Sequence, residues 1–351
     1  MSDTSSMPWR MTIDTNPDMC NLNCVMCEDH SIHAESQRDR KRKGTQRPNM
    51  PKELLERVVR QASEIGITEL IPSTMGEPLL YRNFDLILDL CEELNLKINL
   101  TTNGTFPSPD KHQNVEYWAS RITPIGSDVK ISWNGATAKT QEQIMPRSSF
   151  TEHVDNAKRF IAVRNQVAKD GGNYCKLTMQ LTFLELNLAE IPQMVEMAIK
   201  LGFDRVKGHH LWAHFDEIKS FSLRESSESI KRWNLVVQQC HDIAEKHNLV
   251  NEHKILLENF FELDPNQIEN IAPDGECPFL GKEMWIDPNG RFNVCCAPDQ
   301  QRKKLGDFGN LNDVSVQEIW SSSSYKSLCT SYMDNALCKT CNMRKPKKIV
   351  K

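Results

Sequence analysis

The hydrophobic pattern of residues 1–215 alternates between two periods. Short apolar runs such as 67–73 (ITELIPS) and 175–183 (CKLTMQLTF) predict β-strands. The segments between them carry apolar residues at helical spacing, and 51–66 (PKELLERVVRQASEIG) is an example. The predicted strands cover residues 9–15, 67–73, 96–104, 128–135, 175–183 and 204–212, and the predicted helices cover 51–66, 84–91, 115–122, 150–168 and 190–202.

This alternation indicates an α/β fold, in which helices cover a parallel sheet. Six strand–helix units are too few to close an eight-stranded barrel, so we expect an open, partial (β/α)6 TIM-like barrel. In such folds the chemically active groups lie at the carboxyl ends of the strands. The loops after the predicted strands are therefore the places to search for a site.

The pattern changes after residue 215. Residues 226–248 predict one long helix, with Trp233 and Cys240 on its apolar face. From residue 277 the chain becomes rich in loops, and 285–296 (WIDPNGRFNVCC) predicts a hairpin around Pro-Asn-Gly. We therefore expect three parts: a barrel at 9–215, a helical linker at 216–276, and a small cysteine-rich domain at 277–345.

Composition narrows the classes of protein. The chain has 351 residues and a formal net charge of −4, so bulk charge does not favour a nucleic-acid partner. It has no apolar run of the ~18 residues that a membrane helix needs, and its start does not resemble a signal peptide. We expect a cytoplasmic protein.

The basic run at 38–43 (RDRKRK) predicts a solvated loop, with a docking patch for an acidic electron-transfer protein as the alternative.

Three of the twelve cysteines follow the first predicted strand. Cys20, Cys24 and Cys27 have the spacing Cys-x3-Cys-x2-Cys. An odd number does not form a closed set of disulfides, and clustered thiols in a reducing compartment usually bind metal. A zinc site or a structural cluster would take four ligands. Three cysteines would leave one iron of a cubane cluster open to a substrate or cofactor. A scaffold metal site is the alternative.

Several stretches together resemble the radical S-adenosylmethionine (SAM) superfamily over roughly residues 9–215. Besides the cysteine loop, they are TMGEP at 74–78, TTNG at 101–104 and ISWNG at 131–135. The sequence departs from the family pattern at two positions: Met26 replaces a frequent aromatic residue, and Met75 replaces the first glycine of a Gly-Gly-Glu segment.

This resemblance implies both cofactors and roles. The three cysteines would hold a 4Fe–4S cluster, Met75, Gly76 and Glu77 would hold the amino group of S-adenosyl-L-methionine, and Ser132 and Asn134 would bind its ribose and carboxylate. One electron, from a donor such as flavodoxin or ferredoxin, would cleave a carbon–sulfur bond. The resulting 5′-deoxyadenosyl radical would abstract a hydrogen atom from a substrate.

A second set of thiols lies near the carboxyl end. It has the spacing Cys-x17-Cys, including Gly290-x4-Cys295, followed by Cys-x2-Cys; its members are Cys277, Cys295, Cys338 and Cys341. Four thiols suit a second 4Fe–4S cluster or a zinc ribbon. The spacing resembles the twitch domain, a shortened SPASM domain, and is similar to that of the 2-deoxy-scyllo-inosamine dehydrogenases. Lys347 stands where a full SPASM domain would continue with another cysteine.

Other candidates lie near the sixth strand and the second cysteine set. His209 and His210 could accept a proton during oxidation of an alcohol, and the sequence leaves open which of them faces the inside of the barrel. Cys296 and Cys329 are either core thiols or hydrogen-atom donors to a substrate radical.

These features favour oxidation of a small polar metabolite, with the electron passing to the auxiliary cluster. The alternatives are a radical epimerase that uses Cys329 or Cys296, a peptide-modifying maturase, and a non-catalytic electron carrier. We rank the maturase lower because the cluster loop at residue 20 leaves no room for a preceding peptide-recognition domain.

Overall fold

The computed structural model describes residues 7–72, 75–107, 110, 112–266 and 275–345. Within these residues, nine strands form one sheet in the order β7-β6-β5-β4-β3-β2-β1-β8-β9. All neighbours are parallel except the pair β8 and β9. The strands are β1 Arg10–Ile13, β2 Glu69–Pro72, β3 Lys97–Thr102, β4 Gly126–Ser132, β5 Lys176–Phe183, β6 Arg205–His210, β7 Leu256–Glu258, β8 Glu283–Ile286 and β9 Phe292–Asn293.

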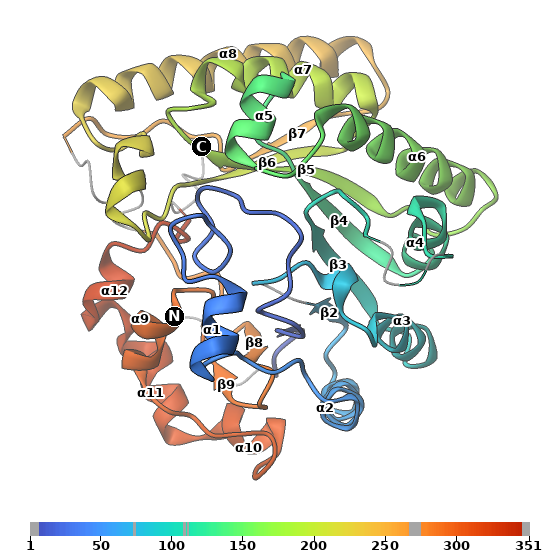
Figure 1. The fold of residues 1–351 in the computed structure, drawn as a ribbon, viewed down its shortest axis with the longest axis vertical. Helices are drawn as coiled ribbons and strands as arrows, with labels where there is room; N and C mark the ends of the chain where they lie inside the picture. Colours follow the sequence, from blue (N-terminus) through green and yellow to red (C-terminus); the bar gives the residue numbers. More distant parts are fainter. Residues whose placement is uncertain (1–6, 73–74, 108–109, 111, 267–274, 346–351) are drawn as a thin grey trace.

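The sheet curves into an arc with helices on its outer side (Figure 1). These helices are α2 Lys52–Glu64, α3 Phe84–Glu93, α4 Val115–Ile122, α6 Phe150–Lys169, α7 Ile191–Leu201 and α8 Ser227–Val250. The shorter α5 spans Ala138–Ile144. The arrangement confirms the predicted partial barrel, because the six expected strands form β1 to β6 in one parallel array. None of the helices in the described ranges is both long and apolar enough to cross a membrane.

The two faces of the sheet differ in character. Along β3 to β6, most side chains that face the helices are buried, whereas many of those that face the inside of the arc are polar and half-buried, although Asp128 and Thr178 are buried there. The half-buried set includes Thr101, Lys130, Ser132, Gln180, Thr182, Lys207 and His209. Mid-strand residues stay partly exposed only where other side chains do not fill the space beside them. The inside of the arc, called the lumen below, is therefore polar and incompletely filled.

The carboxyl-terminal part continues the same sheet. β8 pairs with β1 in parallel, with Met11 opposite Met284, and β9 follows through a turn in which Gly290 has a φ of +85°. This confirms the predicted hairpin. The short helices α9 Asp299–Arg302, α10 Val316–Ser321, α11 Ser323–Ser331 and α12 Ala336–Lys339 follow these strands along the chain and gather in the same part of the molecule (Figure 1). β7, within the predicted linker, adds a strand that the sequence pattern did not indicate.

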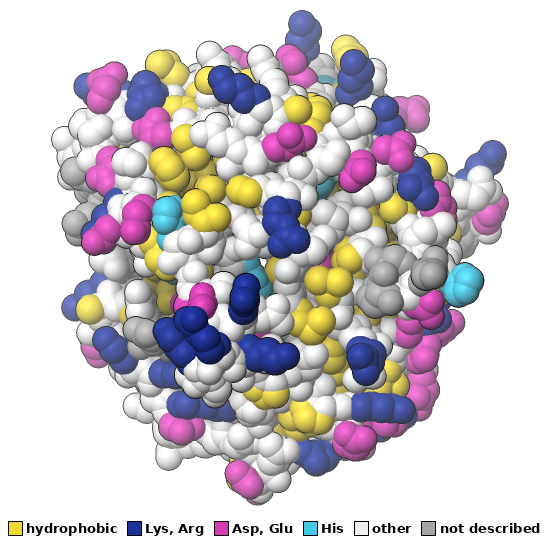
Figure 2. All heavy atoms as spheres, in the orientation of Figure 1, with side chains coloured by type: hydrophobic (Ala, Val, Ile, Leu, Met, Phe, Trp, Pro, Cys, Tyr) yellow, Lys and Arg dark blue, Asp and Glu magenta, His cyan; other side chains and the backbone are white. Residues whose placement is uncertain are grey.

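The basic run at 38–43 is a helix rather than the predicted loop. α1 spans Gln37–Lys43; the Ser36 side chain caps its start, and Gly44 ends it in the left-handed region. Its Arg40 is buried, and basic side chains gather over α1 in Figure 2. The propensity of Arg and Lys for helix, together with both caps, explains the difference.

Candidate functional site

The three cysteines of the first set lie on the loop after β1. All three are half-buried, and Cys27 donates its backbone N–H to the carbonyl of Cys24 at 3.0 Å. The loop is docked on the last residue of α5, since Val25 N–H donates to the Ile144 carbonyl at 3.0 Å. Burial raises the pKa of the Cys27 thiol to about 12. Thiols in such surroundings become thiolates when a cationic metal compensates for the lost hydration, which fits an iron–sulfur site.

Gly76 and Glu77 pack directly against this loop. A Cβ on Gly76 would lie 2.2 Å from the carbonyl oxygen of Asn16 and 2.6 Å from that of Met19, so only glycine fits. The N–H of Glu77 donates to the Met19 carbonyl at 2.8 Å. The preceding Met75 is half-buried, whereas Thr74, which begins the TMGEP motif, lies outside the described residues.

The Glu77 carboxyl group is fully enclosed. It accepts hydrogen bonds from the Thr102 hydroxyl at 2.7 Å, the Asn103 N–H at 2.7 Å and the Leu79 N–H at 3.3 Å. Burial nevertheless raises its pKa to about 7. These three bonds join the segment at 75–79 to the end of β3. The role of Glu77 toward S-adenosylmethionine stays a prediction.

Asn103 is a residue whose role the sequence analysis did not assign. Its side-chain amide donates to Asn21 Oδ1 at 2.8 Å and lies 3.8 Å from the sulfur of Cys20. It therefore connects the end of β3 to the cysteine loop. The signal for it was present, because Asn103 is the third residue of the TTNG stretch at the end of a predicted strand.

An ion cluster that the sequence analysis also missed holds both ends of the loop. Asp18 is buried and pairs with Arg47 at 2.6 Å and Arg40 at 3.1 Å, and Arg47 also reaches Asp29 at 2.8 Å. Burial alone would raise the pKa of Asp18, but hydrogen bonds and charge from Arg47 outweigh it and lower the pKa. The cluster brackets the three cysteines, which lie between Asp18 and Asp29.

The two residues predicted to bind S-adenosylmethionine at the end of β4 differ in burial and in the hydrogen bonds that they already make. Ser132 is half-buried, and its carbonyl oxygen contacts Nε2 of His153 at 2.9 Å. Asn134 is buried, and its Oδ1 accepts the Thr182 N–H at 2.8 Å. Asn134 thereby fixes the position of β5 relative to β4. Binding of the ribose and carboxylate by these two residues stays a prediction.

The two predicted histidines point to opposite sides of β6. His209 faces the lumen, and burial together with the charge of Lys207 lowers its pKa to about 3. His210 faces outward, where its ring packs against Phe183 and Trp233 at centroid distances of 5.3 and 4.9 Å. Strand alternation thus places the His210 ring in the outer core, which does not favour contact with a substrate, and its role as a proton acceptor stays a prediction.

The second cysteine set lines one cavity in the carboxyl-terminal part. This cavity, called the cysteine cavity below, is bounded by Cys277, Cys295, Cys338 and Cys341, and also by Cys296 and Trp212. The four predicted thiols therefore come together although up to 64 positions of sequence separate them, counted from 277 to 341. Among the described side chains no three His, Cys, Asp or Glu converge on a single metal ion.

Cys296 and Cys329 have different surroundings. Cys296 is at the cysteine cavity beside Cys295. Cys329, on α11, is 7% exposed and packs in the core, where its thiol is hydrogen-bonded to the Tyr325 side chain. The hydrogen-donor role predicted for Cys329 is not supported, because its thiol packs within the carboxyl-terminal core.

Comparisons with known proteins agree with this geometry. The family model "Radical SAM superfamily" matches residues 17–198, and "Iron-sulfur cluster-binding domain" (SPASM) matches 277–342. The PqqA peptide cyclase of Methylobacterium nodulans is 22% identical over 298 residues, which cover 82% of this chain and 69% of that protein.

Two solved structures share the fold. Streptococcus suis SuiB bound to S-adenosylmethionine aligns with a TM-score of 0.63 at 17% identity, over 96% of this chain and 72% of SuiB. Native anSMEcpe with bound AdoMet aligns with a TM-score of 0.64 at 15% identity, over 96% of this chain and 89% of anSMEcpe. At these identities the likeness concerns the fold.

Proposed function

The chain belongs to the radical SAM superfamily, and on this premise we propose that it oxidises a small polar metabolite held in the lumen. Its cofactors are those of the two matched families: a 4Fe–4S cluster, S-adenosyl-L-methionine and auxiliary iron–sulfur in the carboxyl-terminal domain. When bound, they supply a 5′-deoxyadenosyl radical that takes a hydrogen atom, and an acceptor for the electron then left on the substrate.

The residues that would hold these groups follow from their positions. Cys20, Cys24 and Cys27 would ligate the first cluster, with Gly76 and Asn103 keeping their loop in place. Cys277, Cys295, Cys338 and Cys341 would ligate the auxiliary cluster in the cysteine cavity. Half-buried thiols suit this task, because limited contact with solvent and cysteine ligation both favour a low reduction potential.

One observation carries the proposal of oxidation. A second cavity, called the lumen cavity below, lies at the open side of the arc and is lined by Lys207, His209 and Lys345, among others. Phe279, Met343 and Arg344 line both the lumen cavity and the cysteine cavity. An electron acceptor in the cysteine cavity would thus be one layer of side chains from a substrate in the lumen, which an epimerase has no need for.

Within the lumen, the residues would bind and orient the substrate and accept a proton. His209 is a weak base, because burial and the charge of Lys207 lower its pKa to about 3. Burial also lowers the pKa of Lys130 to about 8, so Lys130 takes up a proton more readily than His209 does. Lys130 is mostly protonated near pH 7, and its smaller neutral fraction is the better candidate to receive the proton released when an alcohol radical becomes a carbonyl.

A peptide substrate is the second candidate. An open groove of about 910 Å³ runs between the segment after β6 and the carboxyl-terminal domain; Trp212, Arg224, Lys304 and Asn335 are among its lining residues. Such a groove would accept an extended chain. The similarity to PqqA peptide cyclase also favours a peptide.

The test compares the wild type with a Cys338→Ala/Cys341→Ala variant, both reconstituted without oxygen. We expect about eight iron atoms per wild-type chain and about four in the variant. With S-adenosylmethionine and reductant, both should form 5′-deoxyadenosine, and only the wild type should accumulate oxidised product from a panel of polyols, sugars and amino acids. Oxidised product from the variant would contradict the electron-acceptor role. Product only from a peptide library would select the second candidate.

A further inference from the structure

The lumen cavity has a volume of about 140 Å³ and an unusual charge balance. Its lining includes four basic side chains and one carboxylate: Arg10, Lys207, Arg344, Lys345 and Glu283. Arg10 is engaged on two sides, since it pairs with Glu69 and, at 2.9 Å, with Glu283. The one carboxylate on the cavity wall is therefore already paired. Lys207 and Lys345 form their ion pairs with Glu258 instead.

Lys207 and Lys345 form ion pairs with the same carboxylate oxygen. Lys207 Nζ lies 3.1 Å and Lys345 Nζ 2.8 Å from Oε1 of Glu258, while Arg205 takes Oε2 at 2.7 Å. One carboxylate thus serves three cations. An ammonium group has three donors, so each lysine retains donors beyond its contact with Glu258.

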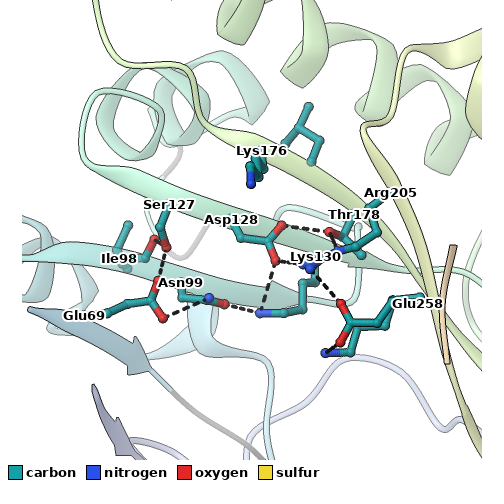
Figure 3. A network of polar contacts seen from close by, with 12 residues as sticks. Glu69, Ile98, Asn99, Ser127, Asp128, Lys130, Lys176, Thr178, Arg205 and Glu258 are labelled. Atoms are coloured by element: carbon teal, nitrogen blue, oxygen red, sulfur yellow. Dashed lines mark hydrogen bonds and ion pairs between the residues drawn. The ribbon is translucent and has the colours of Figure 1, made fainter. Parts of the chain in front are cut away.

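The charged groups next to Glu258 do not neutralise the excess of positive charge. Arg205 also contacts Asp128, and Lys130 lies 3.8 Å from the same carboxylate (Figure 3). In the connected lumen network there are five cations, Arg10, Lys130, Arg205, Lys207 and Lys345, against four carboxylates, Glu69, Asp128, Glu258 and Glu283. The network carries an excess of one positive charge, before Arg344 on the cavity wall is counted.

The neutral groups beside the lysines add a donor. Asn259 Nδ2 lies 3.4 Å from Nδ1 of His209, which makes Nδ1 the acceptor and places the imidazole hydrogen on Nε2. Lys207 and His209 alternate with buried residues on β6, so both point into the lumen. A ligand here would meet two ammonium groups and an N–H donor within partly desolvated surroundings, where charge-assisted hydrogen bonds are strong.

We propose that the lumen cavity binds an anionic group of the substrate, a carboxylate or a phosphate ester, between Lys207 and Lys345. This anchor would hold the substrate inside the barrel. The inference rests on the proposed function only in placing the substrate there.

The test measures binding without turnover, so it does not depend on radical chemistry. Succinate and inorganic phosphate are the probes, with succinamide as the uncharged match of succinate, and affinity is measured calorimetrically on the reconstituted enzyme without reductant. Wild type should bind at least one anion and not succinamide. Lys207→Met should weaken this binding about tenfold or more, because one charge-assisted hydrogen bond is lost. Lys97→Met, at an exposed position outside the lumen, should bind as the wild type does.

Two further arms complete the design. Lys345→Met repeats the test in case Lys207→Met fails to fold, and iron content with circular dichroism identifies such a failure. A pentapeptide with a free or an amidated carboxyl end tells whether the carboxylate can belong to a peptide. Absence of saturable anion binding by wild type, or equal affinity in wild type and both folded variants, would overturn the proposal. Anion binding without any cleavage of S-adenosylmethionine would instead contradict the proposed function alone.

Discussion

At the scale of the residue, Gly76 is a position where the structure leaves no space for a side chain. The two carbonyl oxygens that a Cβ would meet belong to the segment that leads into the cysteine loop. Gly76→Ala must therefore displace that loop. We expect the variant to lose the iron of the first site, about four atoms per chain, while the auxiliary site keeps its own.

Iron counting after reconstitution checks this prediction. Gly171→Ala is the control, because no atom lies within 4 Å of a Cβ added to Gly171, although Gly171, unlike Gly76, has a positive φ of 81°. The control should cost about 1 kcal/mol through backbone strain and keep all its iron. Full iron content in Gly76→Ala would show that the loop can shift without losing the cluster.

The buried His210 side chain is expected to make the folded protein less stable toward acid. Burial lowers its pKa to about 3 in the folded chain, whereas the unfolded chain has a value near 6.5. Between these values the unfolded state takes up a proton that the folded state does not, so stability falls as pH decreases. The slope is about 1.4 kcal/mol per pH unit for such a group. His210→Phe should shift the acid-unfolding midpoint to lower pH.

Unfolding followed by tryptophan fluorescence from pH 7 to pH 3 measures this effect. His210→Leu tests whether the size of phenylalanine matters, and His112→Phe removes an exposed imidazole as the control. The prediction concerns the dependence on pH rather than stability at pH 7. An equal shift in His210→Phe and His112→Phe would contradict it.

At the scale of the element, α1 combines a structural and an electrostatic feature. Arg40 anchors it to Asp18, two residues before Cys20, and the other basic residues of the helix are exposed. A positive surface next to the cluster loop suits an acidic one-electron donor. The triple variant Arg38→Glu/Lys41→Glu/Arg42→Glu should slow S-adenosylmethionine cleavage several-fold with flavodoxin as the donor and leave the rate with dithionite unchanged.

The matched control reverses three exposed lysines on outer helices, Lys169, Lys231 and Lys246, for the same change in net charge. It should leave both rates unchanged. The effect should also fade as salt screens the charges over about 10 Å at 0.1 M. If the two triple variants slow the flavodoxin-dependent rate equally, net charge rather than α1 would be responsible.

At the scale of the whole molecule, Arg10 joins the barrel to the carboxyl-terminal domain. It pairs with Glu69 on β2 and Glu283 on β8, and both carboxylates are buried. Arg10→Met would leave two buried carboxylates without their cation, which typically costs about 3–5 kcal/mol. Arg60→Met removes an arginine that pairs with Glu56 and Glu93 on the surface, and its effect should be small.

Urea unfolding of both variants tests this prediction. The triple variant Arg10→Met/Glu69→Gln/Glu283→Gln should recover much of the lost stability, because it no longer buries unpaired charge. Equal stability of Arg10→Met and the wild type would show that other contacts join the two parts. Failure of the triple variant to recover would assign the loss to packing by the arginine stem.

The order of elements, the partial barrel and the hairpin of the second cysteine region follow from the sequence, because hydrophobic periodicity and turn residues act over a few neighbours. The same holds for the spacing of both cysteine sets and for their resemblance to known families. Errors arose where caps or long-range pairing decided the outcome, as for α1 and β7. The side of β6 that each histidine faces depended on strand register, which sequence left open.

Tertiary structure alone brought Asn103 to Cys20 and Asp18 to Arg40 and Arg47, because these contacts join separate segments of the chain. It also placed the cysteine cavity one layer of side chains from the lumen, and it gathered five cations and four carboxylates from separate strands and loops inside the arc. The sequence alone revealed the cysteine motifs, because their residues are recognised by spacing over short stretches of the chain. The fold decided which of them meet, because distances across a barrel depend on how all its strands are ordered.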